Sequence, residues 1–279
     1  MSTQRSFYPG EEWLYFKLYC SPRTADNILA KGILPFITEL RDGNHIQNWF
    51  YIRYRDPKYH LRLRIRKSSE TSIDKITRAL LTHLESFIHY EFIHSIQIDT
   101  YDREIERYGE DTIELCEEMF SIDSELIVNI TSFNIHDKLL TCVALYIIET
   151  YLDIFQFTHK DKIEYITSKK KQFYTEFGIV GKRKSVFRLK YSLHSELIQK
   201  KISELSQLSP LMTIFSQTKL DMENIANEIM AINNDKSFIY DSIVPSLIHM
   251  SMNRMYRDEQ RLFEAMCYDF LLRKLKNST

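Results

Sequence analysis

An arginine-rich segment, residues 60–66, has residue types and a spacing that suit anion binding. It reads His60-Leu61-Arg62-Leu63-Arg64-Ile65-Arg66. Alternation along a strand would place the three arginines on one face and the aliphatic side chains on the other. Like charges repel, so we expect an anionic group beside them, either a carboxylate, phosphate or enolate ligand or the carboxylates of covering helices. Arg53 and Arg55, just upstream, are expected to join this face.

A second charged segment, residues 100–109, follows a predicted strand. It reads Thr100-Tyr101-Asp102-Arg103-Glu104-Ile105-Glu106-Arg107-Tyr108-Gly109. On a helical turn the carboxylate of Glu104 would lie beside Arg107, and Arg103 beside Glu106. An exposed ion-pair network explains this spacing equally well and would contribute only a few tenths of a kcal/mol. The position between a strand and a helix start makes the segment a candidate site.

A third feature is the sequence Ile248-His249-Met250-Ser251-Met252-Asn253-Arg254 in a predicted late helix. His249 and Asn253 are four residues apart and share a helix face. Imidazole titrates near neutral pH and can therefore move protons. The alternative is a hydrogen-bonded core histidine. Asn253 and Arg254 lie within about one turn and are positioned to orient or polarise the ring.

Several common kinds of site are excluded by the composition. The six glycines are scattered, so neither a dinucleotide fingerprint nor a P-loop can be assembled. The nine histidines include no HExxH pair and no spacing typical of a zinc knuckle. A GxSxG nucleophile turn is absent from the sequence. We therefore expect neither a metal nor a cofactor.

The overall charge and the cysteines indicate the class of protein. The 37 Lys+Arg and 38 Asp+Glu give a net charge of −1, which argues against direct nucleic-acid binding. Apolar runs are too short for a membrane span, and the start of the chain is polar. The four cysteines form no CxxC pair. We expect free thiols and a cytoplasmic location.

Hydrophobic patterning predicts an α+β fold. Residues 12–101 alternate in the order strand, helix, strand, strand, helix, strand. The predicted strands are 12–20, 49–54, 60–66 and 92–98, and the predicted helices are 22–40 and 69–89. This order is that of a ferredoxin-like βαββαβ antiparallel sheet with helices on one face.

The remainder of the chain is predicted to be mostly helical. The predicted helices are 111–129, 136–158, 161–177, 184–207, 221–233 and a broken helix over 237–277. We therefore expect a sheet half at residues 1–108 and a helical half at 109–279, packed as one compact domain. The aromatic first strand and the apolar late helices leave room for a homodimer surface.

The three segments, taken with Phe120, Asp123 and Ser124, resemble the C-terminal domain of class I lanthipeptide dehydratases. The matching motifs are Phe50-Tyr51-Ile52-Arg53-Tyr54-Arg55-Asp56-Pro57, His60-Leu61-Arg62-Leu63-Arg64, Tyr101 to Gly109, and His249 to Arg254. The same module occurs alone as the thiopeptide-type bacteriocin biosynthesis protein. The resemblance extends from Trp13 to about Arg254, and Glu110 and Ser251 depart from the residues common in the family.

The resemblance implies a lyase that acts on a ribosomally made precursor peptide. A separate glutamyl-tRNA-dependent protein would esterify Ser or Thr with glutamate, and this module would then eliminate the glutamate to leave dehydroalanine or dehydrobutyrine. The family's elimination residues map onto Arg62, Arg64, Glu104, Arg107 and His249. Substrate-binding residues are expected at Arg53, Arg55, His60, Tyr101, Asn253 and Arg254.

Two other functions remain open from the sequence. Some members of the superfamily are pyridine synthases, which join two dehydroalanines in a formal [4+2] cycloaddition. A non-catalytic, precursor-binding subunit of a split dehydratase is the other alternative. The elimination residues of the family are retained here, which favours elimination over cycloaddition.

Overall fold

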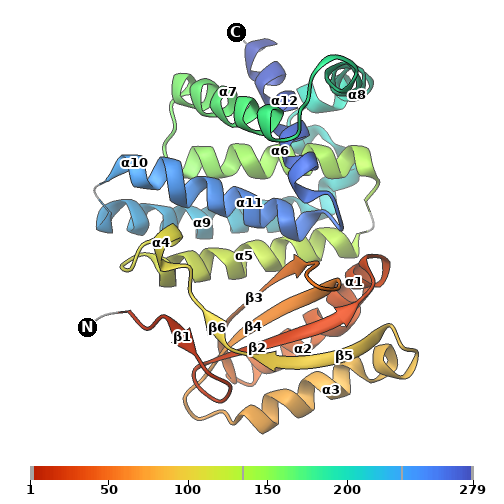
Figure 1. The fold of residues 1–279 in the computed structure, drawn as a ribbon, viewed down its shortest axis with the longest axis vertical. Helices are drawn as coiled ribbons and strands as arrows, with labels where there is room; N and C mark the ends of the chain where they lie inside the picture. The colour runs from red at the N-terminus through yellow and green to blue at the C-terminus, as the bar shows by residue number, and fades with distance from the viewer. Residues whose placement is uncertain (1–2, 134, 234, 278–279) are drawn as a thin grey trace. The chain divides into compact units, whose positions relative to one another are not determined.

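The computed structural model describes residues 3–133, 135–233 and 235–277. The chain forms two compact units (Figure 1). The sheet unit comprises residues 1–134 and 228–258, and the helical unit comprises residues 135–227 and 259–279. This division differs from the predicted break after residue 108, because the chain returns to the sheet unit late in the sequence.

The sheet unit is α+β and contains a four-stranded antiparallel sheet in the order β3-β4-β2-β5. Its strands are β2 (Trp13–Cys20), β3 (Ile46–Tyr54), β4 (His60–Lys67) and β5 (Ile93–Asp99). A second small sheet pairs β1 (Ser6–Phe7) with β6 (Tyr101–Asp102). The four predicted strands are confirmed, with β3 starting earlier than expected. Since β2 is paired along both edges, it offers no free edge to a second copy of the chain.

The first predicted helix is continuous despite its glycine and proline. It consists of α1 (Pro22–Ile28), a π-helical turn (Leu29–Ile33) and α2 (Leu34–Asp42). Pro35, whose nitrogen has no hydrogen to donate, is the second residue of α2 and follows the π turn by one residue. A Cβ at Gly32 would lie 2.7 Å from the Leu84 side chain of α3 (Ile73–His89). A larger residue at this position would therefore require the Leu84 side chain to move, which the close approach of the two helices makes unfavourable.

The core of this unit lies between one face of the sheet and helices α1 to α3. Leu61, Leu63 and Ile65 of β4 all point into it and are fully buried. From α3, Ile76, Leu80 and Leu84 are contributed at helical spacing. The predicted alternation along residues 60–66 is therefore confirmed, and the arginines of β4 lie on the opposite face.

Two helices from the part of the chain that is predicted to be helical pack along the edge strand β3. They are α5 (Ile113–Ser132) and α11 (Val244–Met255). The serine hydroxyl of Ser124 on α5 accepts a hydrogen bond from the backbone N–H of Tyr51 at 3.3 Å. Between β6 and α5 lies the short helix α4 (Ile105–Tyr108). The strand β3 therefore connects the sheet to the segments that carry the second and third sequence motifs.

A buried ion pair holds α11 on α5 and β3. Arg254 donates from Nη1 to Asp123 at 2.7 Å and from Nε to the Tyr51 carbonyl at 2.8 Å. The hydroxyl of Ser251 donates to the same carboxylate at 2.6 Å. Both charged side chains are essentially inaccessible to solvent. Two helices and a strand that are far apart in the sequence are thereby joined at one point.

The helical unit consists of α6 (Asp137–Ile154), α7 (His159–Glu176), α8 (Gly181–Gln199), α12 (Gln260–Asn277) and two 3-10 turns (Ile202–Glu204 and Ser206–Leu211). The helix α9 (Met212–Ile232) runs from this unit into the sheet unit, where α10 (Lys236–Phe238) and a π turn (Ile239–Ile243) follow. The prediction of one helix over 184–207 is wrong beyond Gln199, because the chain changes to 3-10 turns before Pro210. Helix α9 also begins earlier than the predicted residue 221. The expected break within 237–277 is confirmed.

The buried pair predicts a large loss of stability when one partner is removed. In Asp123→Ala, the Arg254 charge would remain buried without its carboxylate, so we expect the free energy of unfolding to fall by about 3–5 kcal/mol. Urea denaturation measures this change. The matched control is Arg78→Ala, which removes the exposed Arg78–Asp74 pair on α3 and should cost no more than about 0.5 kcal/mol. Equal losses in the two variants would contradict the structural role of the buried pair.

Candidate active site

The arginine face of the sheet is built from rows of side chains that lie opposite one another on neighbouring strands. In one row, Arg64 of β4 lies between Tyr15 of β2 and Phe50 of β3, and Asp99 of β5 follows beyond Tyr15. Directly opposite residues in an antiparallel sheet point to the same face. The row therefore forms a continuous strip across the sheet, with Arg64 near its centre.

Arg64 is a buried cation surrounded by aromatic rings. Its side chain is only 9% exposed, and its guanidinium carbon lies 4.6 Å from the ring centre of Tyr15, 4.9 Å from that of Tyr101 and 5.3 Å from that of Phe50. Among the described residues, its buried Nε has no hydrogen-bond partner and its guanidinium forms no ion pair. Burial lowers the pKa of Arg64, although an arginine stays charged in proteins. Arg64 is therefore a buried cation that contacts aromatic rings and has no carboxylate partner within the described residues.

Arg62 lies in the next row, opposite Lys17 of β2. It donates from Nε to His60 Nε2 at 3.2 Å, and its guanidinium stacks 3.3 Å from the ring centre of Tyr54. His60 Nδ1 contacts the Lys58 carbonyl at 2.8 Å. Burial lowers the pKa of His60, which favours the neutral ring that can accept from Arg62. His60 thus positions Arg62.

The carboxylates near this face neutralise only part of its charge. Arg66 pairs with Glu12 at 2.5 Å and approaches Glu114 at 3.7 Å. Lys17 pairs with Asp99. The expectation of neutralising carboxylates therefore holds for Arg66, whereas neither Arg62 nor Arg64 has a carboxylate partner within the part of the chain that is described.

Helix α4 presents a carboxylate and a guanidinium at the surface. Glu104 pairs with Arg107 at 2.9 Å, as their spacing predicts, and both side chains are about half exposed. The Glu104 carboxylate is also close enough to act electrostatically on Arg64. The predicted pair of Arg103 with Glu106 is wrong. Arg103 is buried, where it donates to Glu117 at 2.7 Å.

His249 lies on α11, a helix that is fixed at both ends. Toward the C-terminal end, Asn253 exchanges hydrogen bonds with the backbone of Arg53 on β3, at 2.8 and 2.9 Å. Before the N-terminal end, the Ser242 hydroxyl donates to the carbonyl of Arg107 on α4 at 2.8 Å. The half-buried His249 is placed between these two attachments. Folding therefore brings α11 against the sheet edge and the π turn before it against the helix that carries Arg107.

The remaining predicted binding residues differ in how accessible they are. The prediction that Arg53 joins the arginine face is wrong, because it lies opposite Leu61 on the other face, buried and paired with Asp26 at 2.6 Å. Arg254 is buried in the ion pair with Asp123. Tyr101 is buried against Arg64, whereas Arg55 is exposed in the turn between β3 and β4.

Sequence reasoning missed Tyr15 and Lys17, which lie directly opposite Arg64 and Arg62. The sequence of this segment predicts only an aromatic strand. Alternation along this strand predicts that Tyr15 and Lys17 share a face. That they lie opposite Arg64 and Arg62 could be known only from the register between β2 and β4.

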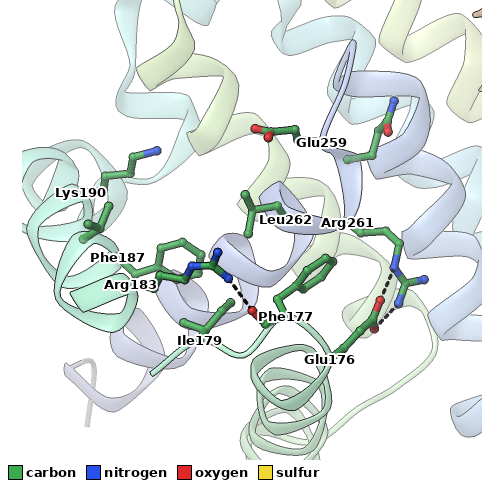
Figure 2. A pocket seen from close by; sticks show the side chains of 11 residues that line it. Glu176, Phe177, Ile179, Arg183, Phe187, Lys190, Glu259, Arg261 and Leu262 are labelled. Atoms are coloured by element: carbon green, nitrogen blue, oxygen red, sulfur yellow. Dashed lines mark hydrogen bonds and ion pairs between the residues drawn. The ribbon is translucent and has the colours of Figure 1, made fainter. Parts of the chain in front are cut away.

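A separate cavity of about 640 Å³ lies in the helical unit and contains none of the predicted site residues (Figure 2). Its apolar walls include Phe177, Phe187 and Leu262. Arg183 lies at this cavity and donates to the Phe177 carbonyl at 2.8 Å, and Glu176 there pairs with Arg261. Apolar walls with charged groups suit an amphipathic ligand.

The described residues provide neither a metal cluster nor a membrane-spanning helix. No group of three or more His, Cys, Asp or Glu that is arranged for a metal occurs in the described ranges. The helices of the same ranges include none with the length and apolar character needed to cross a membrane. All four cysteines are buried and form no disulfide with one another, and burial raises the pKa of the Cys20 thiol to about 12.

Comparison with known proteins decides the family. The model of the lantibiotic biosynthesis dehydratase C-terminal family matches residues 13–275. The chain belongs to this family. Among curated relatives, the nisin biosynthesis protein NisB of Lactococcus lactis is 28% identical over 266 residues, which cover 93% of this chain and 25% of NisB. The chain spans about a quarter of the length of the curated relatives that it matches.

Solved structures share the fold of this family. The tRNA-dependent lantibiotic dehydratase MibB from Microbispora matches 95% of this chain and 28% of its own, with a TM-score of 0.73 and 17% identity. The pyridine synthase TbtD from thiomuracin biosynthesis matches 94% of this chain and 97% of its own, with a TM-score of 0.63 and 10% identity. The fold of this family therefore occurs both as part of a longer dehydratase and over nearly the whole of a pyridine synthase.

The environment of Arg64 predicts that its replacement costs little stability, which is unusual for a buried arginine. Because Arg64 lacks an anionic partner in the described structure, Arg64→Met should change the free energy of unfolding by less than about 1 kcal/mol or increase it. The control Arg254→Met leaves Asp123 buried and unpaired and should cost about 3–5 kcal/mol. Denaturation curves of the two variants give the comparison. An equally large loss in Arg64→Met would contradict the absence of a structural partner.

The neutral ring of His60 predicts a dependence of stability on pH. Its folded-state pKa lies below the ordinary value of 6.5, so the unfolded chain takes up the proton first as pH falls. The stability contributed by neutral His60 is thus fully present above pH 6.5 and is lost as pH drops toward the folded-state pKa. Melting temperatures between pH 8 and pH 5 should fall more steeply for the wild type than for His60→Gln. An equal dependence of the melting temperature on pH in the two proteins would contradict the assignment of a neutral His60 in the folded state.

Proposed function

We propose that the chain is a lyase that eliminates glutamate from glutamylated Ser or Thr residues of a precursor peptide, which leaves dehydroalanine or dehydrobutyrine. The observation that supports this most directly is Arg64, a buried cation on the same face as Arg62, with no anionic partner in the described residues. Elimination generates negative charge twice, on the enolate and on the departing glutamate. Guanidinium groups are suited to both.

The chemistry assigns a role to each proposed catalytic residue. A base removes the α-proton, the electron pair forms the carbon–carbon double bond, and the carbon–oxygen bond to glutamate breaks. His249 is the proton-transfer group, since imidazole titrates near neutral pH. Arg62, Arg64 and Arg107 stabilise the enolate and the carboxylates. Glu104 orients Arg107 through their 2.9 Å ion pair.

The predicted substrate-binding residues are given more limited roles. His60 and Tyr101 act through the arginines that they contact. Arg53, Asn253 and Arg254 hold α11 on β3 and so set the position of His249. Arg55 is exposed, and we propose that it contacts the peptide directly.

The comparisons support the proposed partners. NisB takes part in nisin biosynthesis, and MibB is a tRNA-dependent lantibiotic dehydratase. We propose a separate glutamyl-tRNA-dependent protein as the supplier of the esterified peptide, because elimination acts on a Ser or Thr that already carries the glutamyl ester. No cofactor is required by the mechanism, and the proposed location is the cytoplasm. We also interpret the βαββαβ order with strands in the order β3-β4-β2-β5 as ferredoxin-like.

A pyridine synthase is the second candidate. It is favoured by the likeness to TbtD, which extends over nearly the full length of both chains. Such an enzyme would act on a peptide that already contains two dehydroalanines. It would not release glutamate, so the products distinguish the two activities.

The deciding experiment is mass spectrometry of a precursor peptide that carries a glutamyl-serine ester, incubated with the purified protein. We expect free glutamate and a peptide with dehydroalanine. An intact ester, under conditions in which a homologous eliminase acts, would refute elimination. Conversion of a peptide with two dehydroalanines would then support the cyclase, and binding of the peptide without conversion would support the accessory subunit.

Single substitutions test the roles of the residues. Arg62→Ala, Glu104→Ala and His249→Ala should each lower the elimination rate, by about 10²–10³-fold where a charge-stabilising donor is lost. Arg78→Ala, on the exposed surface of α3, is the control and should keep the wild-type rate. Unchanged elimination in His249→Ala would remove it from the mechanism.

A further inference from the structure

We propose that the hydroxyl of Tyr15 is a further catalytic group of this site, which donates a hydrogen bond to the anionic oxygen that Arg64 receives. The inference rests on the proposed elimination, in which that oxygen belongs to the enolate or to the departing glutamate. It adds a residue of β2 to a set drawn so far from β4, α4 and α11.

Strand register places Tyr15 beside Arg64. Tyr15 lies directly opposite Arg64 on β4 and opposite Asp99 on β5. Its ring centre is 4.6 Å from the Arg64 guanidinium carbon. The side chain is only 4% exposed, so it forms part of the floor of the arginine face. The exposed side chains of Glu104 and Arg107 belong to the same unit.

The hydroxyl of Tyr15 has no hydrogen-bond partner among the described residues, although it is buried. Neighbouring buried tyrosines differ. The hydroxyl of Tyr101 donates a hydrogen bond to Glu117 at 2.8 Å, and that of Tyr51 donates one to the backbone carbonyl of Arg254. A buried polar group without a partner costs about 1–3 kcal/mol. Such a cost is expected where the group is reserved for a ligand.

The Tyr15 hydroxyl and the Arg64 Nε, which belong to residues directly opposite each other on β2 and β4, therefore both lack hydrogen-bond partners among the described residues. Both are donors, and one acceptor oxygen between them would satisfy both. The cation excludes a positively charged ligand and favours an anionic oxygen. Burial raises the pKa of Tyr15 and the nearby Arg64 opposes this rise, so the phenol keeps its proton at neutral pH. It can act as a donor and is not a base.

Tyr15→Phe separates a catalytic role from a structural one, since it removes the hydroxyl and keeps the ring against Arg64. Because no partner is lost in the described structure, the melting temperature should stay the same or rise. The elimination rate should fall by about 10²–10³-fold, as for the loss of one oxyanion donor, and kcat should change more than KM. Tyr90→Phe is the control with an exposed hydroxyl, and Tyr101→Phe is the control that loses a buried hydrogen bond and should be destabilised.

The outcomes separate this inference from the proposed function. If the wild type eliminates glutamate and Tyr15→Phe does so equally fast, the role of Tyr15 is refuted while elimination stands. If Tyr15→Phe is destabilised as much as Tyr101→Phe, the hydroxyl has a structural partner and the inference is wrong. If the wild type leaves the ester intact, the proposed function fails and the role of Tyr15 fails with it.

Discussion

The buried contact of Arg254 with Asp123 and Tyr51 is the interaction on which the geometry of the sheet unit depends. It joins α11, α5 and the edge strand β3 at one solvent-excluded point. A charge in such a place is stable only when its partner is correctly positioned, so the contact permits little variation in how the three elements pack. The position of His249 relative to the sheet edge follows from it, because that residue lies on the same helix.

Two of the buried arginines of this unit, Arg254 and Arg64, serve opposite purposes. Arg254 has its carboxylate inside the protein and contributes to folding. Arg64 is surrounded by aromatic rings and lacks an anionic partner in the described residues, as the hydroxyl of Tyr15 lacks a hydrogen-bond partner. Aromatic faces stabilise a guanidinium while leaving its N–H groups available. A protein can tolerate unsatisfied donors of this kind when a ligand provides the acceptor.

The shared fold explains how one framework can support different reactions. Its likeness to a lantibiotic dehydratase and to a pyridine synthase shows that this arrangement of sheet and helices is common to both. Chemistry must therefore be argued from the side chains on the arginine face. In our proposal, the cations of β4 and α4 stabilise negative charge, and an imidazole from α11 moves the proton.

The sequence by itself determined the order of strands and helices over residues 12–101 and the alternation that separates Arg62 and Arg64 from the core. Both features depend on residues that are close in the chain, where periodicity is a direct signal. The membership of the family was also readable from the sequence, because its motifs are recognised by residue type and order. Only the tertiary structure decided that Arg53 faces the other side of the sheet and that Tyr15 lies beside Arg64. These relations depend on strand register and on contacts between segments as far as 200 residues apart, and a shift of one residue would reverse every face.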